Sequence, residues 1–334
     1  LATCPALTTL DLSRCAGVTD AVVPALVAAC ARLQGLDLSL CPVESPEVAS
    51  ATLEVLRLER CRALRSPRVR APALRRLGMA ESDALAAPVV DAPRLRRLRI
   101  DGTGPGAAPV LRCAALTALS LNGCEGDASF LQGALAHARR LTDLELSGCR
   151  AARALALETS SLARLTVAWC PALAALRLRC GALRSACLRG CSALAAVEVD
   201  APVLHTLELQ KCPALPTEAL EALVQGLGAL HTLRLSDCRG LRALAARAPA
   251  LECVHLSRCR ELRDVRLGCP RLVELSLAQL PLLRHVAVGA PGAEAGADGT
   301  PLRRLSAAAC PLLGDSDVRA LLASSPALLA CDLR

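Results

Sequence analysis

Cysteine and histidine are the residue types in this sequence that could bind a metal ion or attack a substrate. The chain has 19 cysteines and 5 histidines in 334 residues. His205 and His231 occupy equivalent positions in neighbouring segments, as do Cys212 and Cys238. A zinc site needs ligands that converge with tetrahedral geometry. Because the cysteine position is expected to point inward and the histidine position to precede a strand, we predict no metal site.

Covalent catalysis also finds little support in the residue pattern. No cysteine lies in a local motif that would activate it as a nucleophile, and paired catalytic carboxylates are missing. Residues 102–106 are rich in glycine but are expected to form a loop, whereas a phosphate-binding motif joins a strand to a helix. We therefore predict that the protein is not an enzyme and uses no cofactor. Cys187 and Cys253 are expected to face outward and to be the most reactive thiols.

The elements that position these side chains follow one repeated pattern, Leu-x-x-Leu-x-Leu-x-x-Cys. The first copy is Leu7, Leu10, Leu12 and Cys15. Later copies begin at Leu33, Leu53, Leu74, Leu95, Leu116, Leu141, Leu162, Leu183, Leu204, Leu230, Leu251, Leu272 and Leu302, with a degenerate copy at Leu328. A period of about 20 to 30 residues is typical of a solenoid. The last two leucines of each copy are two residues apart, which predicts strands stacked into one long parallel sheet.

The rest of each repeat is predicted to take one of two forms. Short repeats carry a second leucine-rich segment, such as Leu173, Leu176 and Leu178, which predicts a short extended segment on the opposite side of the coil. Long repeats carry inserts with apolar residues at helical spacing, at residues 21–31, 219–226 and 318–323, and more weakly at 129–138. A Thr, Ser or Asp precedes each of the first three and is expected to cap the helix. Loops are expected at 102–109 and 289–300.

The positions of the cysteines argue against disulfide bonds. Those that close a repeat are Cys15, Cys41, Cys61, Cys124, Cys149, Cys170, Cys191, Cys212, Cys238, Cys259 and Cys310. Others lie three residues before the first leucine of a copy. Small thiols at equivalent buried positions behave as compact hydrophobic groups with a weak donor. We therefore expect reduced cysteines and a cytoplasmic or nuclear protein.

Composition excludes two classes of partner. The net charge is +8, but basic residues alternate with acidic ones and aromatic residues are only 1% of the chain, so nucleic-acid binding is not expected. Hydrophobic residues are 53% of the chain, yet the longest apolar stretch, at 21–31, contains Pro24 and is too short to span a bilayer. Lys211 is the only lysine, which indicates a GC-rich genome that supplies arginine instead.

One group of arginines is expected to share an exposed surface of the sheet. The residues two, four and six positions after the first leucine of a copy should face outward. In the third to fifth copies these positions include Arg57, Arg76, Arg97 and Arg99. Neighbouring strands lie about 4.8 Å apart, so the four guanidiniums would form a patch about 10 to 15 Å across. One interpretation is a surface that binds an acidic segment or an anionic ligand; the other is a cross-strand charge ladder that uses Glu59 and Asp101.

Trp169 is the only tryptophan and follows a predicted strand directly before Cys170. An exposed tryptophan would be a candidate hot spot for binding a partner. Packing in the core or at the edge of the sheet is the alternative. The predicted partner-binding residues are therefore the four arginines and Trp169.

The repeat resembles the cysteine-containing class of leucine-rich repeat, most clearly at Cys30-x-x-Leu33-x-x-Leu36-x-Leu38-x-x-Cys41. Copies that begin with Ala-Pro-x-Leu or Cys-Pro-x-Leu resemble the repeats of plant and algal F-box leucine-rich-repeat proteins. The resemblance implies an α/β solenoid, a horseshoe with a parallel sheet on its concave face and mixed short extended segments and helices on its convex face. In that family an F-box domain binds the Skp1 adaptor of a cullin ubiquitin ligase, while the repeats hold the substrate.

These observations together predict a single leucine-rich-repeat domain over residues 1–334, a fragment that is open at both ends because the pattern stops within a coil. Its function is predicted to be protein recognition on the concave face. The resemblance implies the substrate-binding repeats of an SCF-type ubiquitin ligase adaptor, with a Skp1-like protein bound through a segment outside this chain. The alternatives are a ligase-independent scaffold or inhibitor, or a receptor for an anionic ligand.

Overall fold

The computed structural model describes residues 4–82, 84–102, 109–125, 135, 137–289 and 300–333. The chain divides into two compact units, Leu1–Arg153 and Ala154–Arg334. Each unit is a series of similar coils. A coil consists of a strand on a front sheet, a turn, and a return segment on the back. Most of the residues for which we predicted loops at 102–109 and 289–300 and a weak helix at 129–138 lie outside the described residues.

The front sheet of the N-terminal unit is built from the leucine motifs. Its described strands are β1 (Thr9–Asp11), β2 (Gly35–Asp37), β4 (Val55–Arg57), β6 (Arg76–Met79), β8 (Arg97–Asp101), β10 (Ala118–Asn122) and β11 (Asp143–Ser147). Neighbouring strands are parallel and in register, so that Leu56 pairs with Leu77 and Leu77 with Leu98. These leucines are buried while the residues beside them face solvent, as the two-residue period of a strand requires.

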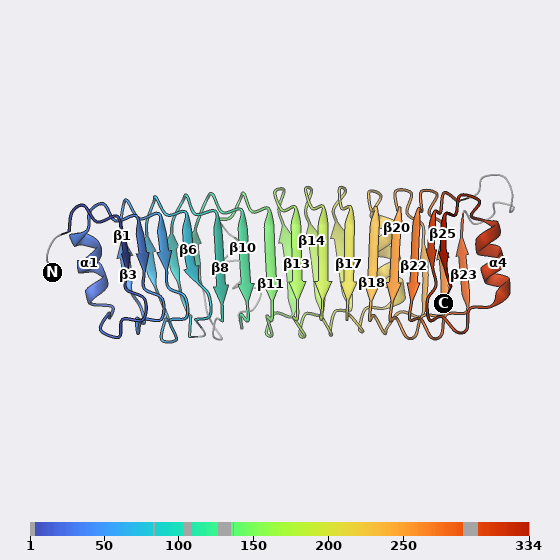
Figure 1. The fold of residues 1–334 in the computed structure, drawn as a ribbon, viewed down its shortest axis with the longest axis horizontal. Coiled ribbons are helices and arrows are strands. Elements are labelled where there is room, and N and C mark those ends of the chain that lie inside the picture. The colour runs from blue at the N-terminus through green and yellow to red at the C-terminus, as the bar shows by residue number, and fades with distance from the viewer. Residues whose placement is uncertain are drawn as a thin grey trace. The chain divides into compact units, whose positions relative to one another are not determined.

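The C-terminal unit has the same arrangement. Its front strands are β13 (Arg164–Ala168), β15 (Ser185–Arg189), β17 (Thr206–Gln210), β18 (Thr232–Ser236), β20 (Cys253–Ser257), β22 (Glu274–Ala278), β24 (Arg304–Ser306) and β25 (Ala330–Asp332). Each of these strands before β25 pairs in parallel with the front strand of the next coil (Figure 1).

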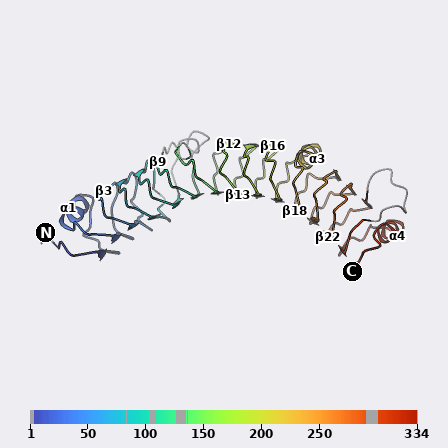
Figure 2. The ribbon, with the colours of Figure 1, turned by 90° about the horizontal axis from the view of Figure 1, so that it is seen from above.

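The second leucine-rich segments form short parallel sheets on the back. In the N-terminal unit this sheet consists of β3 (Glu47–Ala49), β5 (Arg68–Arg70), β7 (Val89–Asp91) and β9 (Val110–Arg112). The C-terminal unit has two such sheets, β12 (Ala154–Glu158), β14 (Ala175–Arg179) and β16 (Ala196–Asp200), and then β19 (Ala243–Ala246), β21 (Asp264–Leu267) and β23 (His285–Val288). Figure 2 shows β12 and β16 of this unit on the side opposite β13 and β18. The predicted solenoid, with a parallel sheet on one face and mixed strands and helices on the other, is confirmed.

Three of the predicted inserts are helices, α1 (Val22–Ala29), α3 (Thr217–Gly226) and α4 (Asp315–Ala323). None of them has the side-chain cap that we expected from the sequence. The acidic side chains near these helices instead bind the next coil. Asp20 accepts the backbone N–H groups of Glu44 and Ser45 at 3.0 and 2.8 Å, and Glu221 accepts that of Ala245 at 2.6 Å. A helix leaves the next back strand without a neighbour, so these carboxylates satisfy donors that a strand would otherwise satisfy.

The turn that ends each front strand before β25 has a left-handed backbone. Glycine takes this conformation at Gly102, Gly123, Gly148 and Gly190, where φ lies between 62° and 67°. Larger residues take it at Arg14, Leu40, Arg60, Glu81, Trp169, Lys211, Asp237, Arg258, Gln279 and Ala309. Such a conformation is unfavourable for residues other than glycine, so the stacking of coils must hold it in place.

The cysteine that follows this turn bonds to the coil before it. Cys41 Sγ donates to the carbonyl oxygen of Leu12 at 3.1 Å, and Cys61 Sγ donates to that of Leu38 at 3.3 Å. The Ser82 hydroxyl makes the same contact with Leu58 at 3.3 Å. The thiols therefore give a second donor to carbonyl groups that already accept a backbone N–H, which is a role that cysteine can fill at the buried position that closes each repeat.

Candidate functional site

The outward side chains of the N-terminal front sheet fall into rows that cross the strands. One row, the first outward row, contains Gly35, Val55, Arg76, Arg97, Ala118 and Asp143. The second outward row contains Asp37, Arg57, Gly78, Arg99, Ser120 and Glu145. The four predicted arginines are all exposed on this sheet, as expected, but they lie in different rows with different neighbours.

Arg57 and Arg99 each have an acidic partner. Arg57 lies 3.3 Å from the carboxylate of Asp37, which is 18% exposed. The Nε of Arg99 lies 3.0 Å from both carboxylate oxygens of Asp101, and this contact raises the pKa of the Arg99 guanidinium. Arg57 thus has a cross-strand acid, although it is Asp37 and not Glu59, whereas Arg99 is paired with Asp101 on its own strand.

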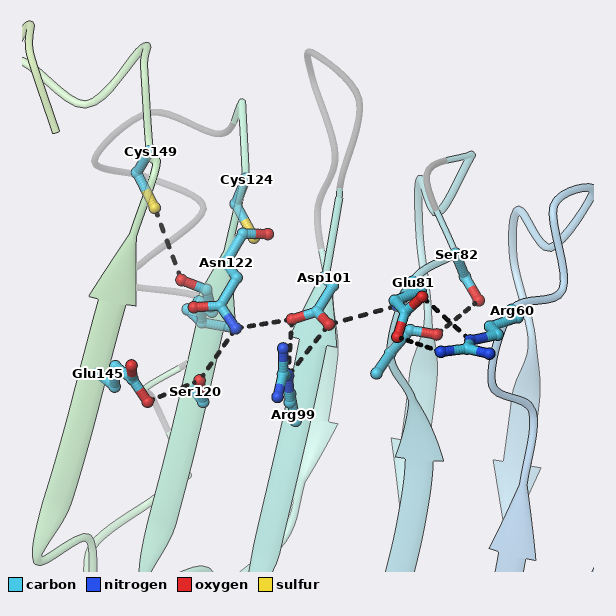
Figure 3. A network of polar contacts seen from close by, with 12 residues as sticks. Arg60, Glu81, Ser82, Arg99, Asp101, Ser120, Asn122, Cys124, Glu145 and Cys149 are labelled. Atoms are coloured by element: carbon cyan, nitrogen blue, oxygen red, sulfur yellow. Dashed lines mark hydrogen bonds and ion pairs between the residues drawn. The ribbon is translucent and has the colours of Figure 1, made fainter. Parts of the chain in front are cut away.

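Asp101 is the centre of a polar network on this surface (Figure 3). It is 8% exposed and also accepts hydrogen bonds from Asn122 Nδ2 at 2.7 Å and from the backbone N–H of Glu81 at 3.3 Å. Asn122 donates to Ser120, which in turn donates to Glu145. These hydrogen bonds join side chains of three neighbouring front strands, so the network fixes the side chains around Arg99.

Glu59, the other acid of the predicted ladder, occupies a different place. A Cβ atom added to Gly78 would lie 2.5 Å from Glu59 Oε1, so the Glu59 side chain covers this glycine. Gly78 lies between Arg57 and Arg99 in the second outward row. The small residue thus leaves room for a carboxylate between two arginines, although no ion pair of Glu59 is observed in the described part of the chain.

Arg76 and Arg97 are direct neighbours in the first outward row and have no acidic partner among the described residues. Val55 and Ala118, on either side of them, carry no charge. Arg75 and Arg96 lie directly before β6 and β8, and of these two only Arg75 has an ion pair among the described residues, with Glu54 at 3.7 Å. Like charges directly opposite each other on neighbouring strands are destabilising. This uncompensated pair is the part of the predicted patch that is available to a partner.

Trp169 lies on the surface of the C-terminal unit rather than in the core. Its φ is 55°, and the residue is 49% exposed. The indole lies across Gly190, where an added Cβ atom would be 2.5 Å from Cε3. Lys211 Nζ is 5.1 Å from the centroid of the ring, which is within the range of a cation–π contact. Edge packing is therefore part of the role of Trp169, and half of the side chain remains accessible.

The two cysteines that we expected to be reactive are half-buried. Burial raises the pKa of both Cys187 and Cys253, and the nearby carboxylates of Glu208 and Glu274 raise it further. A higher pKa leaves less thiolate at neutral pH, so this expectation was wrong. The exposed cysteines are Cys4, Cys15 and Cys331.

The histidines and cysteines considered for zinc do not converge. The rings of His205 and His231 are 4.8 Å apart, and His231 Nδ1 is 2.6 Å from the carbonyl oxygen of Ala229. Cys212 and Cys238 instead donate to backbone carbonyl oxygens of the preceding coils. Over the described ranges, no cluster of three His, Cys, Asp or Glu side chains could hold a metal ion.

Comparison with known proteins assigns no family. Neither a protein-family description nor a curated protein matches the sequence. Among solved structures, a leucine-rich repeat protein from Bacteroides ovatus ATCC 8483 matches with 12% identity and a TM-score of 0.31, over 79% of this chain and 87% of that one. The fold described above rests on the strand pairing alone. None of the helices in the described residues has the length and apolar character needed to cross a membrane.

Proposed function

We propose that the protein recognises an acidic segment of another protein on the front sheet of its N-terminal unit, with Arg76 and Arg97 as the anchoring residues. The observation that supports this is the pairing of these two exposed arginines as direct cross-strand neighbours with no acid beside them. Two forked guanidiniums about 5 Å apart fit the carboxylates of an acidic segment. A partner would supply the missing negative charge and relieve the repulsion between them.

The paired arginines beside them would define where such a segment lies. Arg57 forms an ion pair with Asp37, and Arg99 forms one with Asp101. These two guanidiniums are therefore less available to a partner. The same acids would repel a negatively charged segment that approached the second outward row. Binding is therefore expected along the first outward row.

A synthetic peptide of twelve residues that alternates Glu and Ser, labelled with a fluorophore, provides a test by fluorescence anisotropy. The double variant Arg76→Gln/Arg97→Gln should weaken its binding at least tenfold, and binding should weaken as salt rises because the contact is exposed. Arg177→Gln is the matched control, since Arg177 is exposed but already has an ion pair with Glu198. Equal binding by wild type and the double variant would contradict the proposal.

The narrower role is substrate binding in an SCF-type ubiquitin ligase, implied only by the type of repeat. Co-precipitation of the full-length protein with a Skp1-like adaptor tests it, and no association would reject it without affecting the proposal of protein recognition. A ligase-independent scaffold or inhibitor would bind its partner through the same row without an adaptor. A receptor for a free anion would instead show competition between the peptide and inorganic phosphate for Arg76 and Arg97. In each case we propose recognition without catalysis, in the cytoplasm or nucleus.

A further inference from the structure

A cavity of about 470 Å³ lies on the back of the C-terminal unit. It opens on the sheet of β19, β21 and β23, with α3 packed against β19 and α4 against β23. Its polar lining comes from Gln225, Arg247 and Arg266, and the rest of its lining is Ala, Gly, Leu and Val. A cavity of this size can hold a small organic molecule.

Small residues on the neighbouring strands create the space beside both arginines. Arg266 on β21 pairs in register with Ala245 on β19 and with Ala287 on β23. One position beyond the strand ends, Gly268 and Gly289 line the cavity together with Arg247. The described in-register neighbours of Arg266 are therefore both alanines, whose side chains are too short to cover its guanidinium.

In the first back sheet of the same unit, the equivalent arginine has an acidic partner. There the equivalent row is Ala156, Arg177 and Glu198, and Arg177 Nε lies 2.7 Å from Glu198 Oε2. Ala287 stands where this row has its glutamate. The central arginine is thus present in both sheets, whereas its acidic partner is present in only one.

No acidic residue among the described residues that line the cavity replaces that partner. Glu221 on α3 accepts the backbone N–H of Ala245. Asp264 lies two residues before Arg266 on β21 and does not line the cavity. In the described part of this unit, Arg247 and Arg266 have no ion pair.

We propose that this cavity binds a small organic anion, whose phosphate or carboxylate group lies between Arg247 and Arg266. Guanidinium groups bind both kinds of oxyanion through paired hydrogen bonds. Gln225 offers an additional amide donor, and Ala245, Ala287 and Val288 offer an apolar wall for the rest of the ligand. This site is separate from the front sheet and does not depend on the function proposed above.

Isothermal titration of the full chain with pyrophosphate and, separately, with citrate tests the proposal and distinguishes phosphate from carboxylate ligands. We expect saturable binding of at least one probe in the submillimolar range, and a loss of at least tenfold in affinity for Arg266→Gln. Ala287→Glu should abolish binding, because it recreates the row found at Arg177 and neutralises Arg266. Ala287→Gln fills the same space without charge and should also weaken binding.

Two controls distinguish this site from other arginines. Arg177→Gln and Arg76→Gln/Arg97→Gln should bind the probe as wild type does, and the unfolding midpoint of every variant should confirm that it is folded. The proposal is overturned if neither probe binds, if folded Arg266→Gln binds with unchanged affinity, or if the front-sheet double variant alone removes binding.

Discussion

The only lysine and the only tryptophan of the chain lie together, with Lys211 Nζ 5.1 Å from the centroid of the Trp169 ring. They occupy the same left-handed turn position in coils separated by one coil, and Gly190 occupies it in the coil between them. The indole can bridge this distance because Gly190 has no side chain beneath it. A single tryptophan also means that intrinsic fluorescence reports on this one place.

Gly190→Ala is expected to displace the indole and to destabilise the C-terminal unit by about 1 to 2 kcal/mol. The new Cβ atom would meet the ring at 2.5 Å, and φ at this position is 66°. The emission spectrum and the urea midpoint measure the two effects. Gly181→Ala is the control, because an added Cβ atom there has no neighbour within 4 Å. Unchanged emission from Gly190→Ala would show that the ring does not rest on this glycine.

The hydrogen bonds of the cysteines that close the repeats predict that two substitutions of Cys61 differ in their loss of stability. Its thiol donates to the buried carbonyl of Leu38, which also accepts the backbone N–H of Cys41, so Cys61→Ala removes one of two donors and should cost about 0.5 to 1.5 kcal/mol. Cys61→Ser should cost less, because Ser82 already makes the same contact in the next coil. Urea denaturation of both variants measures the difference. Equal losses would mean that the size of the side chain matters and the hydrogen bond does not.

The solenoid itself was predictable because one sequence pattern repeats with each coil. Leucines two residues apart specify a strand with one buried face, and inserts with helical spacing specify helices. Capping was predicted wrongly because residues such as Asp20 can satisfy donors of their own helix or of the next coil. The spacing within one repeat does not reveal which donors lack a partner. That depends on whether the neighbouring coil contributes a strand or a helix.

For the candidate sites, the sequence predicted which side chains face solvent but not which side chains they contact. The pattern placed Arg57, Arg76, Arg97 and Arg99 outward, but their acidic partners depend on side-chain conformation. Asp101, for example, contacts Arg99 on its own strand and does not bridge to Arg76 or Arg97 on the first outward row. The back cavity was missed, although its signal is present in the sequence. An alignment of the second leucine-rich segments would have shown Ala287 where an earlier coil has Glu198.

Protonation of His255 is expected to lower the stability of the protein as the pH falls from 7.5 to 5.5. Burial lowers the pKa of this histidine below its ordinary value of 6.5, and the charges of Arg234 and Arg304 lower it further, while Glu274 at 3.9 Å opposes them. The unfolded chain therefore takes up a proton at a higher pH than the folded chain. The contribution of His255 to stability is complete well above pH 6.5, decreases as the pH falls below 6.5, and is lost once the pH is below the lowered pKa of the folded state.

The urea midpoint of His255→Gln should change less over this pH range than that of wild type. His137→Gln serves as the control, since His137 is exposed. Identical pH profiles for wild type and His255→Gln would contradict the burial argument.

Asp101→Asn is expected to destabilise the N-terminal unit by about 1 to 3 kcal/mol. Both carboxylate oxygens accept hydrogen bonds, from Asn122 and from the backbone N–H of Glu81. An amide nitrogen at either oxygen position would therefore face another donor. Differential scanning calorimetry measures the loss, with exposed Glu47→Gln as the control. A change no larger than that of the control would mean that water replaces these contacts without cost.

Arg97→Glu is expected to raise stability while it removes recognition of an acidic segment. The substitution places a carboxylate directly opposite Arg76, so a repulsive cross-strand pair becomes an attractive one, with a gain of roughly 0.2 to 1 kcal/mol. Arg177→Glu is the matched control, and it should lower stability because it replaces the attraction to Glu198 with repulsion. A requirement for Arg97 in binding would explain why the chain carries a residue that lowers the stability of its own fold. If Arg97→Glu unfolds at a lower urea concentration than wild type, the two arginines do not repel each other, and the argument for a partner at this position loses its basis.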